Sequence, residues 1–125
     1  MFISPAQNVI KVSYLNVASG TNSVFTFVNG ISVIFQKDGN FVAYNTDDKA
    51  VAATASNSTG DQLVLIFQED GNLVVSNHNR VLWSTGTSGI AAGSDLVIQE
   101  VSPYIRIVGK NGHVYYTARE GNLPE

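Results

Sequence analysis

The sequence predicts a single all-β domain over residues 1–125, made of three similar units that share one core. Three observations support this prediction: apolar residues occur in short strand-like runs, glycine-containing turn dipeptides separate the runs, and a stretch of twelve residues is repeated. No segment keeps the i, i+3, i+4, i+7 apolar spacing of an amphipathic helix. The length suits one core and is too short for two ordinary domains.

Runs rich in β-branched and aromatic residues predict about a dozen short strands. The clearest runs are 24–28, 31–35, 41–44, 63–67, 73–75, 96–98, 104–108 and 113–117. Four dipeptides have the composition of tight hairpin turns that need positive φ angles: Asn29-Gly30, Asp38-Gly39, Asp70-Gly71 and Asn111-Gly112. Strand-like sequence flanks each of them, so we expect antiparallel hairpins.

The repeat is the stronger pattern. Residues 34–45 align without a gap to residues 66–77, and a third copy begins at residue 97 but lacks the Asp-Gly-Asn sequence. The motifs therefore start near residues 36, 68 and 99. Because a unit of this length cannot bury a core by itself, we expect the three units to pack around a pseudo-threefold axis.

A second repeated position follows each motif. Trp83 lies 15 residues after Gln68, and Val51 lies 15 residues after Gln36. The third copy has Tyr115 at this position if one residue is inserted between 109 and 112. We expect Trp83, the only tryptophan, to be a core anchor where the three sheets converge, because large rings dominate core energetics.

The composition excludes several classes of partner. Only 14% of residues are charged, against about 25% in average soluble proteins, and the net charge is −3. The chain thus lacks the basic surface of a protein that binds nucleic acid or anionic membranes. No apolar run approaches the roughly 18 residues of a membrane span, so we expect neither nucleic acid nor membrane insertion.

The chain has no cysteine, which excludes disulfides and thiolate metal sites. His78 and His113 have no companion ligands at metal-binding spacing, so no metal or other cofactor is predicted. Residues 1–8 have neither the basic nor the apolar segment of a signal peptide. The compartment stays open between the cytoplasm and release from the cell.

The first turn gathers side chains suited to a neutral ligand. Gln36, Asp38, Asn40, Val42 and Tyr44 occupy alternate positions around Asp38-Gly39, so they are expected on one face of a hairpin. Their amide, carboxylate and phenol groups can bond sugar hydroxyls, and an apolar side chain can pack on the C–H face of the ring. Asp-Gly-Asn alone is also ordinary hairpin sequence, but the longer pattern, present twice, favours a sugar site.

The pattern Gln36-x-Asp38-x-Asn40-x-Val42-x-Tyr44 resembles the Gln-x-Asp-x-Asn-x-Val-x-Tyr motif of the bulb-type, or monocot mannose-binding, lectins. The resemblance extends from about residue 17 to residue 116. It implies the β-prism II fold, in which three antiparallel four-stranded sheets surround a pseudo-threefold axis and each sheet has one mannose pocket.

The resemblance also implies residue roles. Asp38 and Asn40 would hold the axial 2-hydroxyl of mannose. Gln36 would bind the 3-hydroxyl, Tyr44 the 4-hydroxyl, and Val42 would pack on ring carbons. Glucose has an equatorial 2-hydroxyl and would leave buried polar groups mispaired, at about 1–3 kcal/mol each, so mannose is the expected sugar.

The other two copies depart from the motif. The second copy keeps Gln68, Asp70, Asn72 and Val74 but has Ser76 in place of tyrosine, and a serine hydroxyl is too short to reach where a phenol would. In an ungapped alignment, the third copy has Val101, Pro103 and Ile107 at the Asp, Asn and Tyr positions. We expect one intact, one altered and one degenerate site.

Two other classes of function are weighed against a lectin. An enzyme is not expected, because Asp38 and Asp70 belong to equivalent positions of different repeats and would not flank one substrate. The alternative is a toxin, defence or protein-interaction module that uses the same scaffold with weak or lost sugar binding.

Weak single sites bind usefully only when several are presented together. The family resemblance implies a homodimer formed by exchange of C-terminal strands. The predicted strand 113–117, followed by the polar tail 119–125, is the candidate for exchange, and a monomer that keeps this strand is the alternative.

Overall fold

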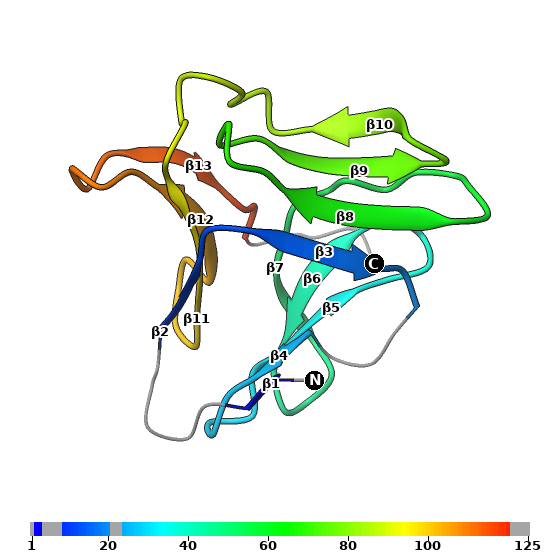
Figure 1. The fold of residues 1–125 in the computed structure, drawn as a ribbon. Coiled ribbons are helices and arrows are strands. Elements are labelled where there is room, and N and C mark those ends of the chain that lie inside the picture. Colours follow the sequence, from blue (N-terminus) through cyan, green and yellow to red (C-terminus); the bar gives the residue numbers. More distant parts are fainter. Residues whose placement is uncertain (1, 4–8, 21–23, 121–125) are drawn as a thin grey trace.

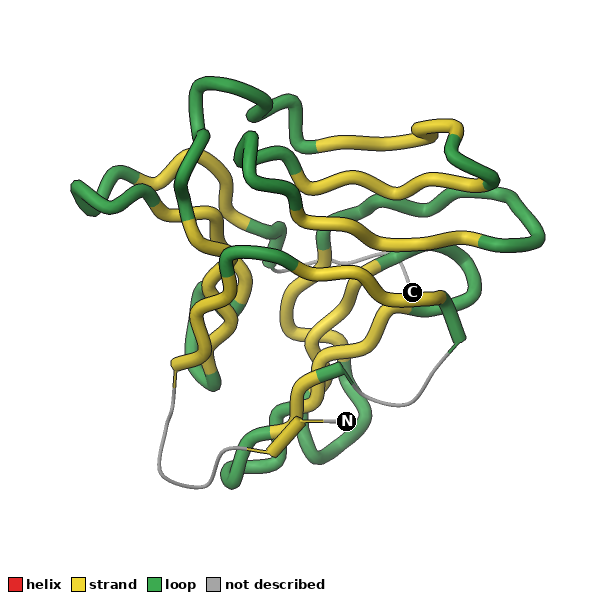
Figure 2. The backbone as a smooth tube through the Cα atoms, viewed as in Figure 1, coloured by secondary structure: helices red, strands yellow, loops and turns green. Residues whose placement is uncertain are grey.

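Three β-sheets surround a shared core (Figures 1 and 2). The computed structural model describes residues 2–3, 9–20 and 24–120, and this part of the chain contains thirteen strands and no helix. The tail residues 121–125, and most of the segment 1–8 in which no signal peptide is predicted, lie outside the described residues.

Each sheet contains four antiparallel strands, and sheet 1 has one further strand at its edge. Sheet 1 has β4 (Phe25–Thr26), β5 (Ser32–Phe35), β6 (Phe41–Tyr44) and β7 (Ala50–Ala53), with β1 (Phe2–Ile3) added parallel to β4. Sheet 2 has β10 (Arg80–Ser84), β9 (Leu73–Asn77), β8 (Leu63–Phe67) and β3 (Leu15–Ala18). Sheet 3 has β13 (Val114–Thr117), β12 (Ile105–Val108), β11 (Asp95–Gln99) and β2 (Val9–Val12). The predicted all-β, three-sheet fold is confirmed.

The inward faces of the three sheets form one apolar core. The ladder pair nearest the turn of each central hairpin is fully buried and is equivalent in all three sheets: Phe35 with Phe41, Phe67 with Leu73, and Ile98 with Ile105. Large apolar side chains at the same register position in each sheet meet in this core, which accounts for the pseudo-threefold arrangement.

Trp83 packs against this core, but its predicted equivalents are displaced by one residue. Trp83 is paired with Val75, and the equivalent pairs are Ala52 with Ala43 and Tyr116 with Ile107. A register shift before each pair, typical of a β-bulge, places Val51 and Tyr115 out of the ladder. The Trp83 and Tyr116 rings meet edge to face with centroids 6.3 Å apart.

The ungapped alignment of the third copy is also wrong beyond its turn. Ile98 pairs with Ile105 as Phe35 pairs with Phe41, so the turn of sheet 3 holds one more residue than those of sheets 1 and 2. Arg106 therefore occupies the position of Val42, and Val108 occupies that of Tyr44. The extra residue lies in the turn that contains the cis Ser102-Pro103 peptide bond.

The loop after the fourth strand of sheets 1 and 2 holds the Asp-Gly turn of the same sheet. In sheet 1, Ser56 Oγ donates to the Gly39 carbonyl at 2.7 Å and lies 2.7 Å from Thr54 Oγ1. In sheet 2, Thr87 Oγ1 donates to the Gly71 carbonyl at 2.6 Å and lies 2.7 Å from Thr85 Oγ1. We call each pair of hydroxyls the hydroxyl clamp.

Sheet 3 has neither the Asp-Gly turn nor the clamp. The backbone N–H of Ala118 donates to the Ile105 carbonyl, as Thr54 N–H does to Phe41 and Thr85 N–H does to Leu73. Alanine thus stands where the other sheets have the first hydroxyl of the clamp. Turn and clamp are present together or absent together.

The end of the described chain joins sheet 3 to sheet 1. Arg119 and Ala53 exchange backbone hydrogen bonds of 2.8 and 2.9 Å, and β13 pairs with β12 of its own chain. Exchange of the C-terminal strand between two chains stays a prediction.

Replacing Thr87 with valine tests the clamp. The substitution keeps the side-chain volume but leaves the buried Gly71 carbonyl and Thr85 hydroxyl without Thr87 Oγ1. We expect Thr87→Val to lower the free energy of unfolding by about 1–3 kcal/mol in urea denaturation. Thr117→Val, at an exposed position of sheet 3, should change it by less than about 0.5 kcal/mol. Equal losses in both variants would contradict the role of the clamp.

Burial raises the pKa of Tyr116 to about 12 from its ordinary 10.0, against the opposing charge of Arg119. The phenol favours its neutral form in the folded state, so its contribution to stability is complete below pH 10 and is lost as pH rises toward 12. We expect wild type to lose roughly 1 kcal/mol more stability than Tyr116→Phe between pH 9 and pH 11, measured by urea denaturation. Identical losses would show that Tyr116 ionises equally in both states.

Candidate functional site

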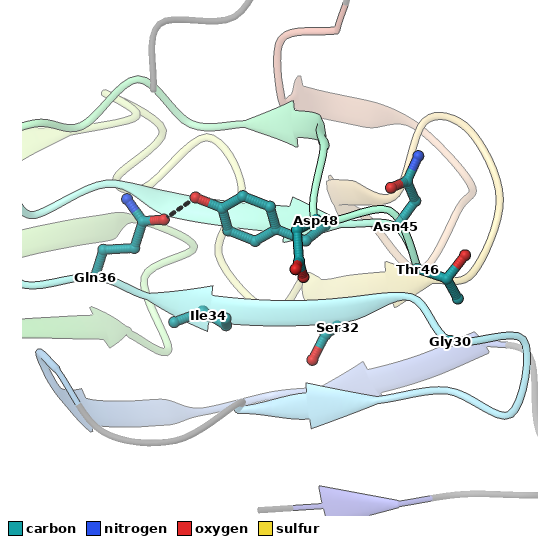
Figure 3. A pocket seen from close by; sticks show the side chains of 8 residues that line it. Gly30, Ser32, Ile34, Gln36, Asn45, Thr46 and Asp48 are labelled. Atoms are coloured by element: carbon teal, nitrogen blue, oxygen red, sulfur yellow. Dashed lines mark hydrogen bonds between the residues drawn. The ribbon is translucent and has the colours of Figure 1, made fainter.

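The outer face of sheet 1 contains a cavity of about 530 Å³ (Figure 3). Its walls come from alternate residues of β5, from the end of β6 and from the turn that follows β6. The pairs Ser32 with Tyr44 and Ile34 with Val42 set which side chains share this face. The lining residues are Gly30, Ser32, Ile34, Gln36, Tyr44, Asn45, Thr46 and Asp48.

Three of the predicted site residues are joined by hydrogen bonds at one end of this cavity. The Tyr44 hydroxyl donates to Gln36 Oε1, shown by the dashed line in Figure 3. Gln36 Nε2 donates to Asp38 Oδ1 and Oδ2 at 3.1 and 3.2 Å. Phenol, amide and carboxylate therefore orient one another at the mouth of the motif turn.

Asp38 also shapes the turn. Its Oδ1 accepts the backbone N–H of Asn40 at 2.9 Å, and its backbone carbonyl accepts Ser58 N–H at 2.8 Å. Asn57 Nδ2 donates to the other carboxylate oxygen, Asp38 Oδ2, at 3.3 Å. The carboxylate is thus held in place from within the turn and from the following loop.

The structure places Asn40 and Val42 beneath the surface. Asn40 is fully buried, its Oδ1 accepts the Ser56 N–H at 3.3 Å, and its Nδ2 has no hydrogen-bond partner among the described residues. Val42 is 2% exposed. In this conformation Asn40 supports the turn, and Ile34 is the apolar residue that lines the cavity.

Sequence reasoning missed several lining residues, namely Gly30, Ser32, Ile34 and the turn residues Asn45, Thr46 and Asp48. Ser32 and Ile34 precede Gln36 at intervals of two, so the alternation of a strand could have placed them on the same face. The turn residues have no such pattern, because their position depends on how β6 pairs with β7.

The second copy keeps the turn but has a different surface. Asp70 Oδ1 accepts the Asn72 N–H at 3.0 Å, and Ser88 Oγ donates to Asp70 Oδ2 at 2.6 Å. Asn72 Oδ1 accepts from the hydroxyl clamp loop, and Val74 is 3% exposed. Ser76 is 6% exposed, and no phenol orients the Gln68 amide.

In the third copy the glutamine is engaged by its own turn. Gln99 Nε2 donates to the Val101 and Ser102 carbonyls, each at 3.2 Å, while Arg106 donates to Gln99 Oε1 at 2.9 Å. The side chain that begins the motif therefore has both ends of its amide occupied.

Other chemical groups are sparse in the described part of the chain. It contains no cluster of three or more His, Asp or Glu side chains that could hold a metal ion. His78 Nε2 lies 2.8 Å from Asp61 Oδ1 at the exposed end of sheet 2, and this hydrogen bond lowers the pKa of Asp61. Within the same residues, no helix is long and apolar enough to cross a membrane.

No protein-family model matches the chain, and no curated protein sequence matches it significantly. Solved structures do match. The lectin of Polygonatum cyrtonema in complex with a monomannoside has a TM-score of 0.60 and 27% identity, covering 82% of this chain and 90% of that one.

Two further plant lectins match over similar lengths. A monomeric mannose-binding lectin from Gastrodia elata has a TM-score of 0.56 and 21% identity, covering 82% of this chain and 94% of its own. The mannose-specific agglutinin of snowdrop, Galanthus nivalis, has a TM-score of 0.53 and 24% identity and covers 94% of both chains. The chain therefore has the β-prism II fold of the bulb-type mannose-binding lectins and resembles that family.

Proposed function

We propose that this protein is a lectin that binds mannose or mannose-containing glycans in the cavity of sheet 1. The observation that supports this most strongly is the hydrogen-bonded set of Tyr44, Gln36 and Asp38 at one end of that cavity. The match to the Polygonatum lectin, solved with a monomannoside, adds support from a chain that is 27% identical.

Sugar hydroxyls both donate and accept, and the set offers both functions. In the proposed complex, Asp38 accepts from the axial 2-hydroxyl, Gln36 contacts the 3-hydroxyl and Tyr44 the 4-hydroxyl. Ile34, the cross-strand partner of Val42, supplies apolar surface for ring carbons. In the proposed complex Asn40 Nδ2, a buried donor without a partner among the described residues, donates to the same 2-hydroxyl.

The three sheets would contribute unequally. Sheet 1 binds best, and the site around Gln68, Asp70, Asn72 and Val74 binds more weakly because Ser76 supplies no phenol. Sheet 3 does not bind mannose, since it lacks the Asp-Gly turn with its carboxylate, and Arg106 takes the place of Val42 and holds Gln99. A homodimer formed by exchange of residues 113–117 would present two sheet 1 sites and increase avidity.

We propose binding without catalysis. Asp38 and Asp70 belong to different sheets, so these two carboxylates do not form the pair that flanks a scissile bond in most glycosidases.

The alternative function is a toxin, defence or protein-interaction module on the same scaffold. The altered second and third copies favour this alternative, because both lack groups that the first copy offers to a sugar. A glycan array separates the two proposals: selective signal on mannosides supports the lectin, and no signal from a folded protein supports the scaffold.

Paired glutamine variants test which sheet binds. Gln36→Ala removes the group that links Tyr44 to Asp38, so we expect the affinity for methyl α-mannoside to fall by about tenfold or more. Gln68→Ala, the matched change in sheet 2, should alter it less than about twofold. Calorimetric titration measures both, with circular dichroism as the folding control. A larger effect of Gln68→Ala, or no effect of a folded Gln36→Ala, would refute the assignment.

A gain of function tests the role of the phenol. Ser76→Tyr places a tyrosine opposite Val64, as Tyr44 lies opposite Ser32, with Gln68 nearby. We expect calorimetry to show tighter binding of methyl α-mannoside at the sheet 2 site. Val108→Tyr, at the equivalent position of sheet 3, should create no site because sheet 3 lacks the Asp-Gly turn and its carboxylate. No gain in a folded Ser76→Tyr variant would show that the phenol is not what sheet 2 lacks.

A further inference from the structure

The outer face of sheet 3 contains a second cavity, of about 280 Å³. Its position corresponds to the cavity of sheet 1, because Asp95 pairs with Val108 as Ser32 pairs with Tyr44. Its lining residues are Lys11, Asp95, Val97, Val108, Gly109 and Lys110. The two cavities therefore share a place in the fold and differ in the side chains that line them.

Positive charge is concentrated on this face. Lys11 and Lys110 line the cavity, and both are exposed. Arg106 is paired with Val97, so it extends from the same face as that lining residue. Three of the seven Lys and Arg residues thus gather on one sheet of a chain whose net charge is −3.

Acidic groups do not neutralise these cations. Asp95 is the only acidic residue that lines the cavity, and the one ion pair within 4 Å that the described residues form joins His78 to Asp61 on sheet 2. Arg106 is bonded to the neutral amide of Gln99, and its buried Nε has no partner among the described residues. The face keeps an excess of positive charge next to a concave surface.

The shape and the remaining groups indicate the kind of ligand. A volume of about 280 Å³ lies just below the roughly 300–1,000 Å³ of cavities for drug-sized ligands, which suits a molecule of monosaccharide size. Lys and Arg are the usual partners of carboxylates and phosphates, and Asp95 can accept from a hydroxyl.

We propose that the sheet 3 cavity binds an acidic monosaccharide, a hydroxylated ring that carries a carboxylate or a phosphate. The anion lies between Lys11 and Lys110, a ring hydroxyl donates to Asp95, and Arg106 adds positive potential from the side. This site is separate from the mannose site of sheet 1 and does not require it.

Titrations followed by amide NMR test this proposal on the wild-type chain. Glucuronic acid supplies the carboxylate, glucose 6-phosphate the phosphate, and glucose the neutral ring. We expect one or both acidic sugars to shift the amide signals of Val97, Val108 and Lys110, and glucose to leave them unchanged. The affinity should fall as NaCl is raised, because salt screens exposed charges. The tighter of the two acidic sugars identifies the preferred anion.

Charge-reversal variants locate the site. Lys11→Glu and Lys110→Glu are exposed changes that should each weaken binding about tenfold or more. Arg80→Glu changes the net charge equally at an exposed position of sheet 2, and it should weaken binding less than about twofold.

Three results would overturn the proposal: no binding of either acidic sugar to the folded chain, equal weakening by Arg80→Glu, or inorganic phosphate binding as tightly as glucose 6-phosphate. Methyl α-mannoside, titrated in parallel, reports on the amides of Gln36 and Tyr44. Each site can therefore fail its own test without affecting the other.

Discussion

The buried carbonyls of the Asp-Gly turns are the constraint on which the rest of the site depends. Gly39 and Gly71 are buried, and a buried carbonyl without a donor costs about 1–3 kcal/mol. The hydroxyl clamp supplies that donor from the loop after the fourth strand. Glycine is required there, since φ is +84° and +85° and an added Cβ would lie 2.8 Å from Ser58 N or 2.1 Å from the Ala91 carbonyl oxygen.

Once the turn is fixed, the polar side chains follow from it. The Asp38 carboxylate accepts the Asn40 N–H inside the turn and the Gln36 amide outside it, so one group both closes the hairpin and orients a glutamine that lines the cavity. Sheet 3 shows the opposite case. Without the Asp-Gly turn and without the clamp, Gln99 bonds to its own turn and Arg106 takes the place of Val42. The same position in the fold thus has different chemistry in different repeats.

The predictability of each element depended on whether its partners were close in sequence. The strands at 41–44 and 63–67 were predicted with their observed bounds, because turn residues and β-branched runs mark their ends. β2 and β3 were not predicted, since they complete sheets 3 and 2 by pairing with β11 and β8, far along the chain. The predicted equivalents of Trp83 in the other two sheets were wrong by one residue, because a β-bulge has no local sequence signal.

The sequence by itself determined the fold class, the three repeats and the clustering of Gln36, Asp38 and Tyr44, because alternation along a strand and turn composition are local properties. The tertiary structure decided which of the motif residues are exposed. Asn40 is buried against the loop after β7, Val42 is buried within the sheet between Ile34 and Ala53, and Ile34 lines the cavity. It also placed Arg106 on the outer face of sheet 3, since an extra residue in the turn shifted the register there. Alternation along a strand does not reveal either outcome, because hairpin register depends on the length of the turn and burial depends on which loop packs over it.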